Sequence, residues 1–459
     1  MRFILGTLLF FFAGLSVSAQ PVVTNHKPGS EVRYPVVILK GTVDEGTKLI
    51  QAKNESSNLN SGTIKGETSG GKFKVLVELV PGENRITLSA DESKKTDLIL
   101  NYKAQTNPHY VRVIWMTDKG GATNYATSYE KDPQNYLEKL DLAAKMLQTF
   151  SAERMFDAGY GRKTFKLELD GDTGKVKVHT LSAPKEAAHY YSIGDQQWYR
   201  EINQWLNKEY PDPFVKNIVI ASYTRKNPET GKMQAHTALG GGNMGLFGGA
   251  SVFSWPDSIQ DITHTFLSDE KIDPAKVHDD SAGRHTVWGL ASTTLGATLH
   301  EMGHAFGLPH CTDPNGIMTR GFDKLNRAFT FVDPPGGRRL KAIPFQDNDV
   351  AYFAPISASY LQWSRWFQLD APPFMDSSRP RITLFHESGD IKIESETPIH
   401  WVGFWQKDSV SKFKEFTGEQ TNILIPAGEW KSILGSDDLT RISAIAENGL
   451  DAVLRLDKK

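Results

Sequence analysis

The chain has 459 residues and a formal net charge of −2 at pH 7. This balance excludes the basic surface that nucleic-acid binding requires, and it excludes an acidic tail. At this length we expect two or three domains. The chain has one cysteine, so no disulfide can form within it, and stability must come from packing and from any bound metal.

The first 19 residues have the features of a secretory signal peptide. A basic start at Met1 and Arg2 precedes an apolar run over residues 3–15, and small residues at 17–19 offer a cleavage site. The run is too short to span a bilayer, which needs roughly 20 residues. We therefore expect a cleaved signal at residues 1–19 and a secreted or periplasmic protein without a membrane span. The alternative is an uncleaved anchor.

Residues 21–104 predict a separate β domain. Short runs rich in Val and Ile alternate with Pro-Gly and Gly-Gly turn signals, and every second residue of 73–79 is apolar. Strands of this length and spacing predict a β-sandwich. The turn that begins at Pro81 resembles those of bacterial immunoglobulin-like modules. We interpret the region as a spacer or adhesion module; a propeptide is the alternative, although the region offers no metal-blocking group.

Residues 107–370 combine strands with amphipathic helices. Residues 110–116 and 218–220 are apolar enough for buried strands, whereas 133–156 and 197–209 carry apolar side chains at helical spacing. The order of strand, helix and strand predicts an α/β lobe with a mixed sheet.

The most informative stretch of this lobe begins at His300. His300 and His304 lie four residues apart, so on a helix both imidazoles project from one face and can reach one Zn²⁺. Glu301 lies on the same side, where it can take a proton from a zinc-bound water. The apolar residues around these positions predict a helix from about Trp288 to Phe306.

A third ligand follows the end of this helix. Gly307 tolerates the conformation that closes a helix, and Pro309 prevents the helix from resuming. The chain can therefore turn and bring His310 to the same metal. Three protein ligands leave one position open for water, which is the layout of a catalytic zinc site and not of a structural one.

The spacing of these residues carries a family resemblance. The pattern His-Glu-x-x-His-x-x-Gly-x-x-His from His300 to His310 resembles the signature of the metzincin zinc endopeptidases. The segment that ends at Met318 is similar to the methionine turn of metzincins, so the resemblance implies that Met318 supports the metal site without binding the metal. Residues 115–331 more loosely resemble a family of zinc metallopeptidases from fungi and bacteria. No tyrosine closely follows Met318, so no tyrosine is assigned as a transition-state donor.

Residues 239–255 are rich in glycine but lack the phosphate-binding Gly-x-x-x-x-Gly-Lys pattern. Two interpretations stay open. The stretch is either a flexible loop or close to the edge strand along which, in metzincins, an extended peptide binds through its backbone.

Two other sets of metal-binding residue types have simpler interpretations. His278, Asp279, Asp280 and His285 match no metal spacing, so a polar loop is favoured over a second metal site. Cys311 follows a proposed ligand directly; because consecutive side chains point apart, we expect a small buried apolar residue.

After the methionine turn we expect residues 322–331 and 347–367 to be mostly helical, with aromatic faces that close the lobe. A Pro-Pro pair at 372–373 marks a boundary. Residues 371–459 predict short strands, either as a β-sandwich accessory domain or as a part of the catalytic lobe.

Together these features predict a multidomain protein: an immunoglobulin-like β-sandwich, a central α/β metzincin-like domain and a C-terminal β-rich region. The expected function is a secreted zinc endopeptidase that acts on proteins or peptides, with Glu301 as the catalytic base. One alternative is a secreted binding or adhesion protein that retains a zinc site. Another is a zinc hydrolase of non-peptide amides. The oligomeric state stays open.

Overall fold

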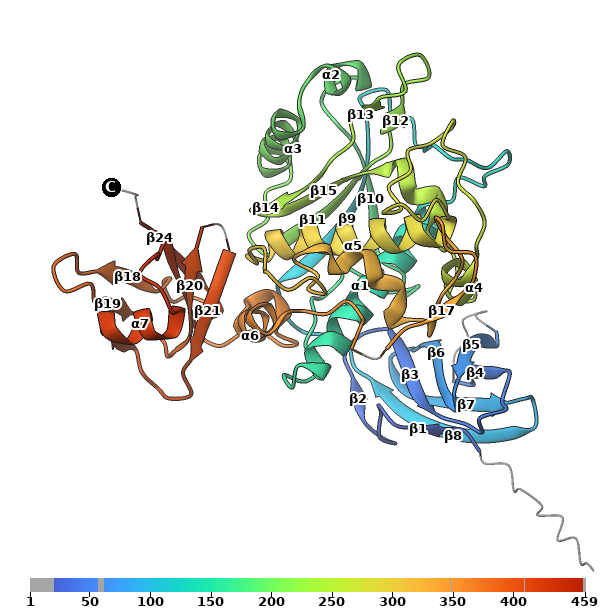
Figure 1. The fold of residues 1–459 in the computed structure, drawn as a ribbon, viewed down its shortest axis with the longest axis horizontal. Helices are drawn as coiled ribbons and strands as arrows, with labels where there is room; N and C mark the ends of the chain where they lie inside the picture. The colour runs from blue at the N-terminus through green and yellow to red at the C-terminus, as the bar shows by residue number, and fades with distance from the viewer. Residues whose placement is uncertain (1–19, 57–61, 347, 408, 457–459) are drawn as a thin grey trace, which may run out of the picture.

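The structure, a computed structural model, describes residues 20–56, 62–346, 348–407 and 409–456. The predicted signal peptide, residues 1–19, lies outside them. An N-terminal sheet, a central α/β lobe and a C-terminal pair of small sheets follow one another along the chain (Figure 1). Within the described residues, every helix is too short or too polar to cross a membrane.

The N-terminal sheet has eight strands in the order β1-β3-β6-β5-β4-β7-β8-β2. Strand β5 pairs with both β4 and β6, and only the contact between β2 and β8 is parallel. The strands are β1 (Val22–Val23), β2 (Glu31–Val32), β3 (Val36–Thr42), β4 (Ile50–Asn54), β5 (Ile64–Ser69), β6 (Lys72–Glu78), β7 (Gly82–Ala90) and β8 (Lys94–Tyr102).

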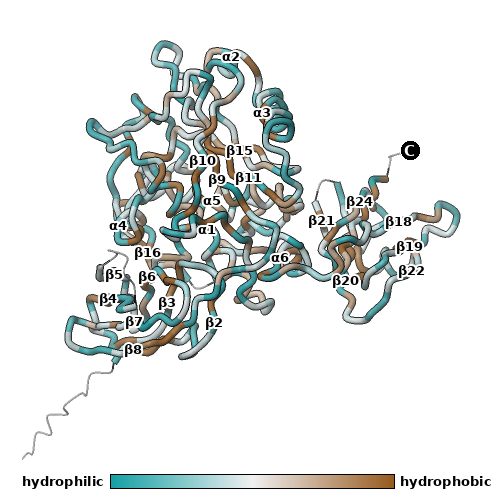
Figure 2. The backbone as a smooth tube through the Cα atoms, turned by 180° about the vertical axis from the view of Figure 1, so that it is seen from behind, coloured by the Kyte–Doolittle hydropathy of each residue, from teal (hydrophilic) through white to brown (hydrophobic). Residues whose placement is uncertain are grey.

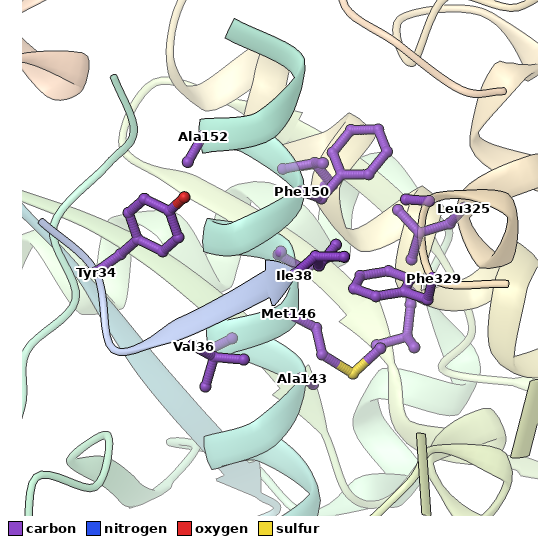
Figure 3. Packing of buried hydrophobic residues seen from close by; sticks show 14 of the residues in the cluster. Tyr34, Val36, Ile38, Ala143, Met146, Phe150, Ala152, Leu325 and Phe329 are labelled. Carbon is purple, nitrogen blue, oxygen red and sulfur yellow. The ribbon is translucent and has the colours of Figure 1, made fainter. Parts of the chain in front are cut away.

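Strand β3 is buried on both of its faces, from Val36 to Leu39. One face contributes to the interior of its own domain. The other packs on the long helix α1 (Tyr136–Asp157), where Val36 and Ile38 lie beside Ala143 and Met146 (Figure 3). The N-terminal sheet and the central lobe therefore share one continuous apolar core.

The central lobe is built on a mixed sheet, as predicted. Its strands are β9 (Tyr110–Thr117), β10 (Val178–Ser182), β11 (Val215–Ala221), β14 (Ala238–Gly241) and β15 (Met244–Gly248). Their order is β10-β9-β11-β15-β14, and every pairing is parallel except that of β14 with β15. In Figure 2 the central strands are among the most apolar parts of the chain, and the loops are mostly polar.

Helices cover both faces of this sheet because alternate strand residues point to opposite sides. Ile114 and Val219 face α3 (Asp195–Glu209). Val113 and Ile220 face the core that contains α1 and α5 (Val287–Ala305). The remaining short elements are α2 (Ala187–Ser192), α4 (Asp261–Leu267), η1 (Gly249–Ser254), β12 (Arg225–Lys226), β13 (Met233–Gln234), β16 (Val332–Asp333) and β17 (Ile343–Pro344).

The predicted helices after the methionine turn are shorter than expected. The first is a 3₁₀ segment, η2 (Arg320–Ala328), interrupted at Lys324. Helix is absent from the described residues 348–354, and α6 (Pro355–Trp363) and η3 (Arg365–Phe367) follow. The reason is Pro355, which fits the first turn of a helix but drives the preceding residue into extended backbone.

The C-terminal region is β-rich, as predicted, and adds one helix that periodicity did not indicate, α7 (Ala427–Leu434). Its two sheets have the orders β18-β19-β22 and β21-β20-β23-β24 and enclose a core of their own. The strands are β18 (Arg381–Leu384), β19 (Ile391–Glu394), β20 (Ile399–Gln406), β21 (Ser409–Glu415), β22 (Asn422–Ile425), β23 (Arg441–Ala446) and β24 (Asp451–Arg455). Trp401 of β20 donates to the Ser359 hydroxyl of α6 at 2.8 Å, which joins the region to the central lobe.

Candidate metal centre

Helix α5 carries the first two candidate ligands. The hydroxyl of Thr286 accepts a hydrogen bond from the Gly289 backbone N–H at 3.3 Å and caps the start of the helix. From Val287 to Gly303 every residue is buried, because the sheet and η1 cover one side and η2 the other. A helix packed on all sides holds the side chains near its end in fixed positions.

Three histidine side chains converge beyond this helix end. His300 and His304 come from α5, and His310 from the turn that follows Gly307, whose φ of +99° suits glycine. One ligand atom from each of the three rings lies within 4.8 Å of the other two. The Nε2 atoms of His304 and His310 are 3.2 Å apart. The predicted third ring therefore reaches the other two.

Backbone carbonyls orient two of these rings. Nδ1 of His300 donates to the Ile317 carbonyl at 2.8 Å, and Nδ1 of His304 donates to the Leu308 carbonyl at 2.8 Å. A proton on Nδ1 leaves the Nε2 lone pair available for a metal. Neither carbonyl was predicted, because the sequence does not reveal which backbone atoms the folded loop brings to a ring.

This donor set fits a zinc ion. Two nitrogens bound at 2.0–2.1 Å in tetrahedral geometry are roughly 3.3 Å apart, close to the 3.2 Å between His304 and His310. Burial lowers the pKa of His300 to about 4 and also lowers the pKa of His304. Both rings are therefore neutral near pH 7, as metal binding requires.

Glu301 lies next to the first ring but outside the group of three ligand atoms. Its side chain is buried, and this burial raises the pKa of the carboxyl group to about 7. A carboxyl group with this pKa can both accept and release a proton near neutral pH.

Met318 and Cys311 are buried residues of the segment that begins at the third ring. Met318 is fully buried, and a Cβ built on Gly303 would stand 2.3 Å from its sulfur, so the methionine lies directly against the ligand helix. Cys311 is buried, as predicted, with its sulfur 3.0 Å from the Thr319 hydroxyl.

The glycine-rich stretch forms the edge of the central sheet. It folds into the β14–β15 hairpin, in which β14 is the outermost strand, so the edge-strand interpretation holds over the flexible-loop one. A Cβ on Gly240 would stand 2.0 Å from the Glu301 carbonyl oxygen. Glycine is required here because the hairpin lies against the backbone of α5.

Tyr199 of α3 is a residue that the sequence analysis missed. Its hydroxyl donates to the Gly241 carbonyl at 2.7 Å and lies 3.1 Å from the Met244 carbonyl, so it supports the turn of the hairpin. Tyr199 lies on a helix with an apolar face, and no spacing pattern in the sequence distinguishes it from its neighbours.

In the polar loop before α5, the candidate ligand side chains do not gather around one point. His285 pairs with Asp279 through Nδ1. Among the described residues, His300, His304 and His310 form the only cluster of three or more side chains that could hold a metal ion.

Comparison with protein families gives one match that covers most of the chain. Residues 20–400 match the family described as "Metallopep: Putative peptidase family". The chain belongs to this peptidase family.

Two curated relatives have names that agree with the site. One, "Putative zinc metalloproteinase C607.06c" of Schizosaccharomyces pombe, is 30% identical over 278 residues, 56% of this chain and 45% of the relative. The other, "Putative zinc metalloproteinase YIL108W" of Saccharomyces cerevisiae, is 26% identical over 456 residues, 91% of this chain and 62% of the relative. The chain thus spans about half to three-fifths of their lengths. The predictions of zinc and of a zinc-metallopeptidase family are confirmed.

Among solved structures, wild-type OgpA from Akkermansia muciniphila is similar, with a TM-score of 0.44 and 16% identity. The similarity covers 77% of this chain and 94% of that chain.

Proposed function

We propose that this chain is a zinc-dependent endopeptidase. The ligands are His300, His304 and His310, and Glu301 is the general base. The observation that carries the proposal is the meeting of three imidazoles beside one buried carboxyl group. A bound Zn²⁺ would polarise the substrate carbonyl and lower the pKa of a bound water.

Each residue of the site has one task in this reaction. Glu301 takes a proton from the attacking water and passes it to the leaving amine, for which a pKa of about 7 is suited. The carbonyls of Ile317 and Leu308 keep two of the rings in the ligand orientation. Met318 supports the rings from below.

The peptide substrate binds along strand β14. This strand is the free edge of the central sheet and lies against the backbone of Glu301. An extended peptide can add to such an edge through backbone hydrogen bonds, which brings a scissile bond toward the metal ligands.

The wider organisation is also proposed. A signal peptide at residues 1–19 directs secretion, an immunoglobulin-like domain at 21–104 precedes a metzincin-like catalytic domain at 107–370, and 371–459 is an accessory domain. The eight-stranded N-terminal sheet and the separate C-terminal core support these boundaries.

Replacement of Glu301 tests the proposal. Glu301→Gln keeps the size of the side chain but cannot accept the proton, so we expect cleavage of denatured casein to fall at least about a hundredfold. Zinc content, measured by atomic absorption, should stay at one per chain because the three ligands are intact. Wild-type cleavage by a zinc-loaded Glu301→Gln protein would contradict the role of Glu301.

The same assay separates the two alternatives. A binding or adhesion protein would cleave nothing, with or without a chelator. A hydrolase of non-peptide amides would leave casein intact but release product from small acylated amines in a chelator-sensitive way.

A further inference from the structure

The turn that carries the third metal ligand lies against the C-terminal region. Residues 307–309 line a small pocket together with side chains of α6, β20, β21 and β24. Leu308 is buried and belongs to the same apolar core as Trp405 and Val410. Helix α6 and strand β21 lie side by side at this place (Figure 1). The ligand turn is therefore covered by a part of the chain that comes long after it.

Strand β20 presents one face to each core, because alternate side chains of a strand point to opposite sides. Val402 and Phe404 lie in the core of the C-terminal sheets. Trp401 and Trp405 lie in the main core, and so does Val410, which pairs with Trp405 from β21. The face that carries these three residues is the one that covers the ligand turn.

A backbone pairing reaches the third ligand itself. His310 and Ser409 form an isolated parallel β-bridge. Ser409 is the first residue of β21, so this strand begins beside the backbone of His310. Ser409 also lies beyond residues 20–400, the part of the chain that matches the peptidase family. The C-terminal region therefore extends as far as the metal centre.

A second contact reaches the residue that closes the ligand helix. A Cβ built on Gly307 would stand 2.4 Å from the Tyr360 hydroxyl oxygen, so α6 lies directly against the turn. The same hydroxyl donates to the Asp451 carboxylate of β24, and this carboxylate pairs with Arg379 at 3.1 Å. Tyr360 thus links the start of the ligand turn to a strand of the C-terminal sheet.

His310 depends on such contacts more than the other two ligands do. His300 and His304 belong to α5, and backbone carbonyls accept hydrogen bonds from Nδ1 of both rings. His310 follows the end of the helix and is exposed. Its position is therefore set by whatever holds the turn in place.

We propose that the C-terminal region positions His310 for the metal, with Trp405, Val410 and Tyr360 as positioning residues. These side chains hold the turn against α5, so that the third ring stays beside the other two. The inference rests on the ligand role that the proposed function gives to His310. If the turn is in place for only a fraction of the time, the apparent Kd for the metal rises by the inverse of that fraction.

Zinc affinity measures this positioning without catalysis. The full chain and its variants compete with a chromophoric chelator for Zn²⁺ at pH 7, and the absorbance gives the Kd for zinc. We expect Val410→Ala to raise this Kd about tenfold, because the turn loses a side chain that packs on it. An unchanged Kd would overturn the proposal.

Val402→Ala is the matched control. It removes the same groups from the same sheet, but from the face that lines the C-terminal core. The Kd for zinc should therefore change less than about twofold. Equal effects of Val402→Ala and Val410→Ala would show a general loss of stability and would overturn the proposal.

A second background shows whether Val410 acts through the third ring. In a His310→Ala protein, Val410→Ala should leave the zinc affinity unchanged, because both changes act on one ligand. A further tenfold loss would overturn the proposal. If His310→Ala alone binds zinc as tightly as wild type, the proposed ligand set fails and this inference fails with it. Weak binding by His310→Ala, together with wild-type binding by Val410→Ala, refutes only the inference.

Tyr360→Phe keeps the test informative if Val410→Ala fails to fold. It removes only the hydroxyl that lies against Gly307, so we expect the Kd for zinc to rise about threefold. Tyr34→Phe is its control, since Tyr34 is another buried tyrosine whose hydroxyl donates to a carboxylate, that of Glu153. Equal Kd values for the two tyrosine variants would overturn the proposal.

Discussion

Gly240 lies where the edge strand and the ligand helix touch. A methyl group there would meet the Glu301 carbonyl oxygen at 2.0 Å, and both partners are backbone. Neither can move without displacing β14 or the end of α5. The position therefore couples the hairpin to the candidate base.

We expect Gly240→Ala to lower the free energy of unfolding by about 1–3 kcal/mol, because overpacking forces the backbone apart. Urea unfolding followed by tryptophan fluorescence measures the change. Gly171→Ala is the control, since a Cβ there meets nothing within 4 Å and should cost less than about 0.5 kcal/mol. Equal stability of the two variants would contradict the close contact.

His109 is a buried histidine that stays neutral. Its Nδ1 donates to the Asn107 side-chain oxygen at 3.1 Å, and its Nε2 faces a guanidinium nitrogen of Arg365 at 3.4 Å. Burial, followed by the charges of Arg365 and Lys216, lowers the pKa of His109 to about 4. Protonation therefore favours the unfolded chain.

This shift predicts a pH dependence of stability. The contribution of His109 is complete above pH 6.5, its ordinary pKa, and is lost as the pH falls through 4. Between these values wild type should lose up to about 1.4 kcal/mol per pH unit more than His109→Phe. Urea unfolding of both proteins at several pH values checks the difference; parallel pH profiles would contradict it.

For individual residues, the sequence predicts contacts between positions that have a fixed spacing along the chain. It does not predict contacts between distant positions that only the folded structure brings together. His300 and His304 follow from helical geometry, and His310 follows from the turn at Gly307. The carbonyl of Ile317 and the hydroxyl of Tyr199 come from loop closure and from another helix, and nothing local indicates them.

Helix α1 joins the N-terminal sheet to the central lobe through one buried carboxylate. Glu153 is 1% exposed and accepts from Arg162 at 2.7 Å and Tyr34 at 3.2 Å; Lys40 lies 3.5 Å away. Burial pushes the pKa of Glu153 upward, but the charges of Lys40 and Arg162 outweigh it, so the pKa lies below its usual range.

Glu153→Gln should destabilise the protein by about 3–5 kcal/mol, because it leaves buried cations without their counter-charge. Glu138→Gln, at an exposed position of the same helix, should change stability by less than about 0.5 kcal/mol. Denaturant midpoints of the two variants test the expectation. A Glu153→Gln protein as stable as wild type would show that the pairing contributes nothing.

This helix also shows what periodicity leaves open. The predicted range 133–156 agrees well with Tyr136–Asp157, since apolar spacing reveals a helix reliably over this length. Two polar side chains of this helix, however, are buried against the N-terminal sheet: Lys145 donates to Glu78 of β6, and Thr149 donates to the Val36 carbonyl of β3. The spacing of residues along a helix distinguishes its polar face from its apolar face. It does not show whether the polar face contacts water or a neighbouring domain with complementary charges.

At the scale of the whole molecule, one apolar core connects all three regions. It runs without a break from the N-terminal sheet through α1 and α5 to Trp401 and Trp405 of β20, whereas a smaller core belongs to the C-terminal sheets alone. The sequence predicts three successive regions along the chain. It did not predict that the first two share an interior, because shared burial depends on contacts far apart in the chain.

Metal removal should destabilise the core against which the proposed ligands pack. A metal that binds only the folded protein adds about 4 kcal/mol at a thousandfold excess over its Kd. Differential scanning calorimetry should show that a chelator lowers the Tm of the wild-type protein. A His304→Asn protein, which lacks a proposed ligand, should not respond, and an equal shift in both proteins would contradict a stabilising metal at this site.

The burial of Cys311 has a practical consequence. It is the only thiol of the chain, it is 7% exposed, and it lies in the loop between the third ring and Met318. A maleimide reagent can modify it only when that loop opens. The rate of alkylation, followed by mass spectrometry, therefore measures how often the segment after His310 opens. No label has to be introduced for this measurement.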